Sequence, residues 1–211
     1  MRLTTIHIEN YRCFNKLDVT FGEHITLLVG KNGVGKSAIL DAIAVAVSTF
    51  LYGFGGGTGR RILKEDAKYN FYEIEGTIDA QHQFPVIIEA EGTCNGESNV
   101  RWTRALNAPD GNTTVKNAYR LINFAKQMQS QVMAGDRDTT LPVISYYGTG
   151  RLRTRKKERR GLQTLQKFNR QMGYTDCMNA EPNEKLMADW FERMTLKCLQ
   201  NQQNPAGNGY S

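Results

Sequence analysis

The segment Gly30-Lys31-Asn32-Gly33-Val34-Gly35-Lys36-Ser37 decides the fold, because it matches G-x-x-x-x-G-K-[ST] at every fixed position. Its glycines let successive backbone amides converge on phosphate oxygens, and the helix that follows directs about half a positive charge at the same place. In such a loop the lysine, Lys36, reaches the β- and γ-phosphates, and the Ser37 hydroxyl binds magnesium. All eight residues are therefore predicted to form a phosphate-binding loop (P-loop) for a nucleotide triphosphate with Mg²⁺.

The residues on both sides of the P-loop have the patterns of a strand and of a helix. Ile25–Val29 is a nearly continuous apolar run, which is typical of a strand buried on both faces of a parallel sheet. After Ser37 the apolar residues recur at helical spacing and predict one buried stripe, made of Ile39, Leu40, Ile43, Val47 and Phe50. This order predicts an α/β fold of the P-loop type.

Two half-buried strands are expected before the loop. Leu3–Ile8 and Leu17–Phe21 alternate between apolar and polar residues, with a bend at Asn10–Phe14 between them. Asn15–Asp18 spells N-K-x-D, with which GTPases read guanine, but the alternation turns Asp18 toward solvent. We interpret this match as a coincidence and predict ATP as the nucleotide.

The rest of the chain predicts further strands and helices. Strand-like segments separated by turn residues predict an antiparallel β meander over residues 71–106, made of Phe71–Ala80, Phe84–Glu91 and Val100–Leu106. Helical spacing predicts helices over about 114–133 and 183–200, and Leu141–Tyr147 has the pattern of a second buried strand. Gly53–Gly59 contains five glycines in seven residues and predicts a loop.

Length and composition indicate one domain, which we expect in the cytoplasm. The chain has 211 residues, and none of its apolar runs approaches the roughly 20 residues of a membrane span. The N-terminus lacks the apolar block of a signal peptide, and we expect no membrane association. The four cysteines stand far apart without a C-x-x-C pair, which argues against a zinc site or a disulfide framework.

Positive charge is concentrated in one run. The formal net charge is +6, and the stretch from Arg151 to Arg160 alone carries seven basic side chains against Glu158, namely Arg151, Arg153, Arg155, Lys156, Lys157, Arg159 and Arg160. Three interpretations stay open for this basic loop (residues 151–161): a solvated surface, contact with nucleic-acid phosphates, or docking of an acidic partner protein. No aromatic residue interleaves the run, so stacking on single-stranded bases has little support.

The opening of the chain resembles the N-terminal lobe of SMC-, Rad50- and RecF-type ATPases, which are ABC-type ATPase heads. The resemblance covers Ile8–Phe14 with its N-[FY]-R segment, then Ile25–Val29, the P-loop and Ile39–Ile43. It implies that Arg12 lies near the bound nucleotide. It also implies that residues 1–200 form lobe I of such a head, with a mixed sheet, a β meander and flanking helices.

A finer resemblance, to PtuA-type ATPases of bacterial Septu and retron anti-phage systems, rests on Leu141–Arg151 and on Trp190-Phe191 in the last helix. It implies an ATP-binding subunit of a defence complex, in which the nucleotide state controls a PtuB-like HNH nuclease. The partners that it implies are a second ATPase head, that nuclease, and a retron reverse transcriptase with its DNA.

Part of the family pattern is missing from the sequence. An ABC-type head also needs a signature motif near L-S-x-G and a hydrophobic strand ending in Asp-Glu (Walker B), and neither occurs in these 211 residues. We therefore expect ATP hydrolysis only in a longer protein, with the polar residues 201–211 as a linker to a C-terminal lobe. Two alternatives stay open: a DNA-repair ATPase of the RecF or Rad50 type, and a small P-loop kinase.

The basic loop gives a first prediction. If it contacts nucleic acid, replacing Arg155, Lys156 and Lys157 by glutamate will flatten the salt dependence of DNA binding, because each charge that neutralises a phosphate releases counterions. The measurement is the fluorescence anisotropy of labelled duplex DNA over a series of salt concentrations. An unchanged slope would exclude the DNA contact.

Overall fold

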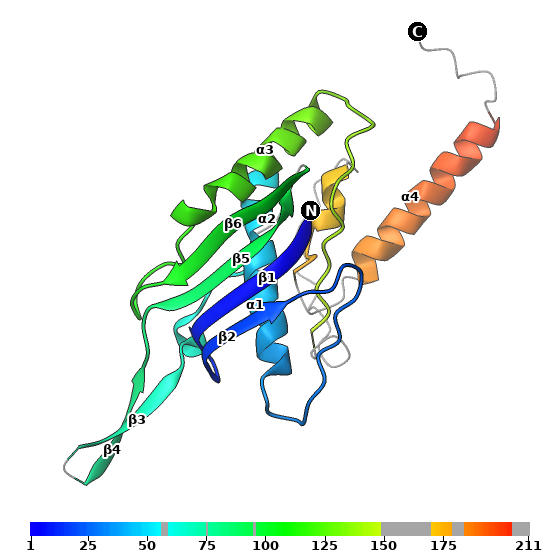
Figure 1. The fold of residues 1–211 in the computed structure, drawn as a ribbon. Helices are drawn as coiled ribbons and strands as arrows, with labels where there is room; N and C mark the ends of the chain where they lie inside the picture. The colour runs from blue at the N-terminus through cyan, green and yellow to red at the C-terminus, as the bar shows by residue number, and fades with distance from the viewer. Residues whose placement is uncertain (56–58, 75, 95, 149–169, 179–183, 204–211) are drawn as a thin grey trace.

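The computed structural model describes residues 1–55, 59–74, 76–94, 96–148, 170–178 and 184–203. Its centre is a four-stranded sheet in the order β2-β1-β5-β6, with helices packed on one face (Figure 1). β1 (Arg2–Tyr11) pairs with β2 (Phe14–Thr20) and with β5 (Val86–Cys94), and β5 also pairs with β6 (Glu97–Leu106). All of these pairs are antiparallel.

The sheet has one buried and one open face. Side chains alternate across a strand, and on β5 the residues alternate strictly between buried and half-buried, with Val86, Ile88 and Ala90 in the core. On β1, Ile6 and Ile8 are buried in the same layer. Two strands of the predicted meander thus complete one sheet with the two N-terminal strands.

The first segment of the predicted meander is a hairpin instead of a single strand. β3 (Tyr69–Ile74) and β4 (Thr77–His82) form a separate two-stranded sheet that projects away from the four-stranded one (Figure 1). Gly76 has φ +78° between the two strands, a conformation that glycine adopts without steric cost. The prediction of one strand over Phe71–Ala80 was therefore wrong, because this turn divides it.

Helix α1 (Lys36–Val47) packs on the sheet through its small residues. Its buried apolar residues are mainly alanines, with one valine: Ala38, Ala42, Ala44, Val45 and Ala46. Trp102 of β6 is buried beneath the helix and donates a hydrogen bond to the carbonyl of Ala46 (3.0 Å). Small side chains let the helix approach the sheet closely enough for this contact.

The predicted apolar stripe was wrong within α1. Leu40 is exposed, and Ile39, Ile43 and Val47 are only half-buried. Phe50, the last member of that stripe, is fully buried, but it belongs to the next helix, α2 (Thr49–Phe54). Apolar spacing alone did not show which side of the helix would meet the sheet.

Helix α2 packs against α3 (Tyr119–Met133), which follows the short 3₁₀ turn η2 (Lys116–Ala118). The rings of Phe50 and Phe54 stack with centroids 5.4 Å apart. Gly53 lies against the carbonyl of Ile122, where a side chain would clash. The predicted loop therefore starts later than expected, because Gly53 is a helical residue at a helix–helix contact; residues 56–58 lie outside the described part of the chain.

The joined helices α1 and α2 form a stretch, Lys36–Phe54, that is apolar and long enough to cross a membrane, with a mean hydropathy of 1.7. Of the 18-residue window that gives this value, 61% is buried inside the folded chain. Burial of this extent is typical of the core helices of a folded domain.

The C-terminal part contributes one long helix. α4 (Glu184–Gln203) confirms the predicted helix and extends it by three residues. In Figure 1 it lies apart from the sheet. The remaining short elements are the 3₁₀ turns η1 (Lys64–Asp66) and η4 (Arg170–Tyr174).

The two predicted parallel strands are absent from the described structure. Ile25, Leu27 and Val29 are between 80% and 84% exposed, and Val143 is 96% exposed. A parallel strand needs a hydrogen-bonded neighbour, and among the described residues no strand pairs with Ile25–Val29 or Leu141–Tyr147. The strand predictions for both segments were therefore wrong; Ile25, Leu27, Val29 and Val143 are exposed, whereas Ile144 is buried in the core.

Arg104 of β6 is fully buried without a carboxylate partner among its described contacts. Its Nε donates to the carbonyl of Thr114 (2.8 Å), its Nη1 to the hydroxyl of Thr49 (3.1 Å), and its guanidinium lies 5.0 Å from the ring centre of Tyr52. Burial lowers the pKa of Arg104 below its ordinary value. This side chain therefore ties β6 to α2 through neutral groups alone.

These contacts predict how Arg104 contributes to stability. Replacing Arg104 by Ala should lower the free energy of unfolding by about 2–4 kcal/mol, because it leaves a cavity and unpaired acceptors. Replacing it by Met should cost less, since a side chain of similar length fills most of the cavity that Ala leaves, while both variants remove the buried charge. Urea denaturation followed by circular dichroism measures both, with the exposed Arg101→Ala on the same strand as a nearly silent control. Equal losses for Ala and Met would contradict this account.

Candidate functional site

The P-loop lies at the N-terminus of α1, where the sequence predicted it. Gly35 caps the helix with φ +97°, Gly33 has φ +85°, and the amide of Ile39 donates to the carbonyl of Gly35 (3.0 Å). Side-chain-bearing residues rarely adopt these backbone angles, so the loop geometry depends on the two glycines. The remaining predicted residues of the loop, Lys31, Asn32, Val34 and Ser37, are exposed, and Gly30 begins it.

The residues of the loop fit an anion such as a triphosphate. The first amides of α1 have no acceptor within the helix, as at any helix N-terminus, and they carry its positive dipole end. The Lys36 ammonium donates to the carbonyls of Gly30 and Lys31, each at 2.7 Å, so it is folded back over the loop by neutral groups. The exposed hydroxyl of Ser37 belongs to the same first turn. Among the described contacts Lys36 forms no ion pair. Its ammonium could therefore turn to a bound phosphate and give up only these two hydrogen bonds to carbonyl groups.

The turn between β1 and β2 lies directly against the P-loop. A side chain at Gly35 would overlap the ring of Phe14 and the thiol of Cys13. Arg12 belongs to the same turn and has φ +51°, an uncommon value for a residue with a side chain. Arg12 directly precedes Cys13, so its backbone lies near the loop, while its place beside a bound nucleotide, which the family resemblance implies, stays a prediction.

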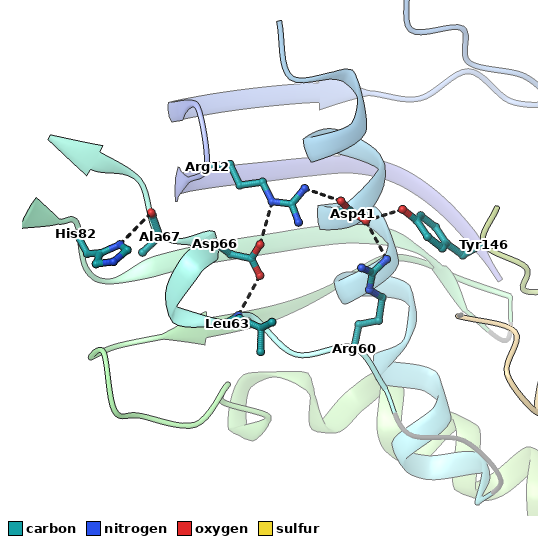
Figure 2. A network of polar contacts seen from close by, with 8 residues as sticks. All are labelled: Arg12, Asp41, Arg60, Leu63, Asp66, Ala67, His82 and Tyr146. Carbon is teal, nitrogen blue, oxygen red and sulfur yellow. Dashed lines mark hydrogen bonds and ion pairs between the residues drawn. The ribbon is translucent and has the colours of Figure 1, made fainter. Parts of the chain in front are cut away.

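Two carboxylates hold the Arg12 guanidinium (Figure 2). Its Nη1 donates to Oδ2 of Asp41 at 2.5 Å, and its Nε donates to Oδ1 of Asp66 at 2.9 Å. The second oxygen of Asp66 accepts the amide of Leu63 (3.0 Å), and the carbonyl of Asp66 accepts the Arg12 amide (2.7 Å). Both the backbone and the side chain of Arg12 are therefore fixed by η1.

Asp41, one helical turn beyond Ser37, is the junction of this network. Its Oδ1 accepts a hydrogen bond from the hydroxyl of Tyr146 (2.5 Å) and one from Nη1 of Arg60 (2.9 Å). The Arg60 guanidinium also lies 4.7 Å from the ring centre of Tyr146. Together with Arg12, these residues make three donors to the Asp41 carboxylate, and Figure 2 shows Arg12, Arg60 and Tyr146 converging on it.

The charges of the network set its protonation. Burial by itself raises the pKa of the Asp41 carboxyl, but hydrogen bonds from Tyr146 and Arg12 and the charge of Arg60 outweigh it, so the pKa lies below its ordinary value. Burial raises the pKa of Tyr146, and its hydrogen bond to Asp41 raises it further. At neutral pH the network therefore consists of an anionic Asp41, two arginine cations and a neutral tyrosine.

A cleft of about 510 Å³ opens beside these residues. It is lined by arginines and by apolar groups at the edges of β1 and α1: Tyr11, Arg12, Val45, Gly59, Arg60, Arg61, Leu63 and Asp66. Clefts of this size accept small ligands, and three arginines favour an anionic one. Arg12 lines this cleft, and the next residue, Cys13, lies against Gly35 of the P-loop, so the cleft and the loop meet at the β1–β2 turn.

Sequence reasoning named the P-loop and Arg12 as nucleotide-site residues, which stays a prediction, and it did not name Asp41, Arg60, Asp66 or Tyr146, which the structure joins to Arg12 in one network. The adjacent arginines after the glycine-rich segment were the one local signal, since paired cations beside a loop indicate anion contact. Asp41 appeared only as a helical residue within Ile39–Ile43. The predicted basic contacts, Arg151 to Arg160, lie outside the described residues.

Comparison with known proteins gives a family for this architecture. A family model described as an AAA domain (AAA_23) matches residues 5–204. The retron Ec83 probable ATPase of Escherichia coli is 26% identical over 92% of this chain. The DNA double-strand break repair Rad50 ATPase of Methanosarcina mazei is 39% identical over 31% of it, and the DNA replication and repair protein RecF of Chlorobaculum tepidum is 42% identical over 30%.

The chain spans only part of these relatives, 35% of the retron ATPase, 5% of Rad50 and 17% of RecF. Among solved structures, a chain from work on ATP-driven dimerization and DNA-stimulated activation of SMC ATPases is 19% identical, with a TM-score of 0.39 over 59% of this chain and 80% of that one. With the family match, the predicted α/β fold of the P-loop type is confirmed.

The Asp41 network predicts a pH-dependent stability. Because the pKa of Asp41 in the folded chain lies below its unfolded value of about 3.9, its contribution is complete above that pH and is lost as the pH falls through the folded value. Asp41→Asn should weaken the network by about 1–3 kcal/mol at pH 7 and flatten the loss of stability on the acid side. Urea denaturation over a series of pH values measures both effects.

Tyr146→Phe is the matched variant for this experiment. It removes one of the three hydrogen bonds, the one that lowers the pKa of Asp41 most, and keeps both arginines, so it should show a smaller loss at pH 7 and an acid-side slope between those of the wild type and Asp41→Asn. If Asp41→Asn unfolds with the wild-type pH profile, the assigned network does not hold the carboxylate.

Proposed function

This chain belongs to the AAA domain family, and from that premise we propose that it is the ATP-binding lobe of an SMC-like ATPase. The observation that carries the proposal is a glycine loop at the N-terminus of α1 whose lysine, Lys36, is hydrogen-bonded to backbone carbonyls of the loop, with the side chain of Arg12 held by Asp41 and Asp66. The relatives described as Rad50 and RecF proteins support the same class.

The P-loop residues would hold the phosphates of the nucleotide. The amides of Gly30–Ser37 and the Lys36 ammonium bind phosphate oxygens, and Ser37 supplies a hydroxyl ligand for magnesium. When bound, magnesium neutralises phosphate charge and orients the phosphate chain. Arg12, held by Asp41 and Asp66, contributes a fixed cation at the edge of the site, and the arginine-lined cleft receives the remainder of the nucleotide.

Hydrolysis would belong to a longer protein and to a pair of heads. No Asp-Glu strand or signature motif occurs in this sequence, so the lobe binds the nucleotide and other segments complete the reaction. In SMC-like heads the second lobe and a second head provide these parts, which makes nucleotide binding a signal for head association.

The defence role is the finer part of the proposal. Similarity to the Escherichia coli retron ATPase extends over most of this chain and supports an ATPase that serves an anti-phage complex with a PtuB-like HNH nuclease and a retron reverse transcriptase with its DNA. The shorter matches to Rad50 and RecF favour the alternative of a DNA-repair ATPase. Nucleotide binding at the P-loop is common to both.

Binding of a fluorescent ATP analogue with Mg²⁺ tests the central claim. Lys36→Ala should weaken binding about 10- to 100-fold, because it removes a charge-assisted contact to phosphate. Arg12→Ala should weaken it by a smaller factor. The control is Lys126→Ala, an exposed lysine on α3, which should bind like the wild type.

ATP hydrolysis by this chain alone should be negligible in the same preparation. Steady ATP hydrolysis that Lys36→Ala abolishes would show that the lobe is a complete enzyme. It would contradict the proposal that other segments complete the reaction. Phosphoryl transfer to a small acceptor, without association of two chains, would favour the kinase alternative.

A further inference from the structure

The hairpin β3–β4 is an arm with a firmly held root. At its root the rings of Tyr69 and His82 are in contact, with their centres 3.9 Å apart and their planes tilted by 37°. The amide of Gln83 donates to the carbonyl of Lys68 (2.8 Å), and the ring of His82 lies 3.3 Å from the carbonyl of Ala67. Among the described residues the two strands form a ladder only with each other.

One face of the arm exposes an apolar patch. Phe71 is 72% exposed and Ile78 is 77% exposed. Phe71 lies opposite Ala80 and Ile78 lies opposite Glu73, so the two apolar residues are diagonal neighbours on the same face. Tyr72 and Asp79 form the pair between them on the other face. Exposed apolar residues grouped on a projecting element mark a surface that contacts another protein.

The charge of the arm selects its partner. The sequence from Tyr69 to His82 contains three acidic residues, Glu73, Glu75 and Asp79, and neither lysine nor arginine. This charge repels nucleic-acid phosphates. Carboxylates next to exposed aromatic rings suit arginine, because a guanidinium stacks on a ring and pairs with a carboxylate at the same time.

The chain itself contains a segment of the complementary composition. Residues 151–160 read RLRTRKKERR, with five arginines and two lysines against one glutamate. Arginine side chains from such a segment can stack on the exposed ring of Phe71 and pair with the carboxylate of Glu73 on the same face of the hairpin. Docking of an acidic partner was one of the three open interpretations of this run.

We propose that the face of the hairpin carrying Phe71, Glu73 and Ile78 docks the arginine-rich segment 151–160 of a second copy of this chain. Each copy offers one arm and one arginine-rich segment, so the contact can join two copies reciprocally or in a head-to-tail series. This association does not use the P-loop and is independent of the proposed ATP binding.

The first experiment measures binding of a fluorescein-labelled peptide with the sequence of residues 151–160 to the whole chain by anisotropy at low salt. Phe71→Ser and Glu73→Lys should each weaken binding at least fivefold. The matched controls on the opposite face, Tyr72→Ser and Asp79→Lys, should change it by less than twofold. A peptide with lysine at every arginine should bind several-fold more weakly, since lysine lacks the planar guanidinium.

The second experiment identifies the source of the segment. Sedimentation of the wild-type chain without nucleotide should show salt-sensitive association that rises with protein concentration. Glu73→Lys and Arg155→Glu/Lys156→Glu/Lys157→Glu should each abolish it, and an equimolar mixture of these two variants should recover dimers, because one intact arm meets one intact segment.

Several outcomes would overturn the proposal. Equal losses for variants on both faces would show that charge alone attracts the peptide, and absence of peptide binding would remove the docking site. A chain that binds the peptide but stays monomeric at every concentration would exclude a second copy as the source. Failure of ATP binding would leave all of these readouts unchanged, so the two proposals are tested separately.

Discussion

The carboxylate of Asp41 is the point on which the arrangement of this molecule depends. Its two oxygens accept hydrogen bonds from Arg12, Arg60 and Tyr146, which come from three separate segments, while Asp41 itself lies on the helix that begins at the P-loop. A largely buried carboxylate is stable only when donors replace the water that it loses. The three segments therefore have to converge at one place, next to the loop.

Both α1 and the segment before the P-loop expose apolar side chains. The helix meets the sheet with alanines and Val45 and leaves its larger residue Leu40 exposed, and Ile25, Leu27 and Val29 before the loop are exposed as well. Apolar residues exposed in such numbers are typical of a surface that another protein segment covers. This agrees with the proposal that a further lobe completes the ATPase head on this side, while the antiparallel sheet provides a core on the other.

The projecting hairpin and the nucleotide site share a common support. Asp66 holds the side chain of Arg12, and Ala67, the next residue, contacts the ring of His82 at the root of the hairpin. Figure 2 shows these contacts in one view. The arm that we propose to bind an arginine-rich segment is thus rooted one residue away from Asp66, which holds the arginine that we propose to stand beside ATP. Both proposals use surfaces built on the same short turn, η1.

The sequence by itself determined the features that local patterns encode. These are the P-loop and its helix, the first two strands with their bend, the strands β5 and β6, and the helices α3 and α4. Only the tertiary structure decided which side of α1 is buried, that β1 and β5 are neighbours, and that the segment 71–80 is a hairpin outside the main sheet. The Asp41 network could not be predicted from local sequence patterns either, because Tyr146 and Asp41 are 105 residues apart in the chain. The spacing of apolar residues along one segment predicts whether that segment is a helix or a strand. Which distant segments lie next to each other depends on the free energy of the whole packed chain.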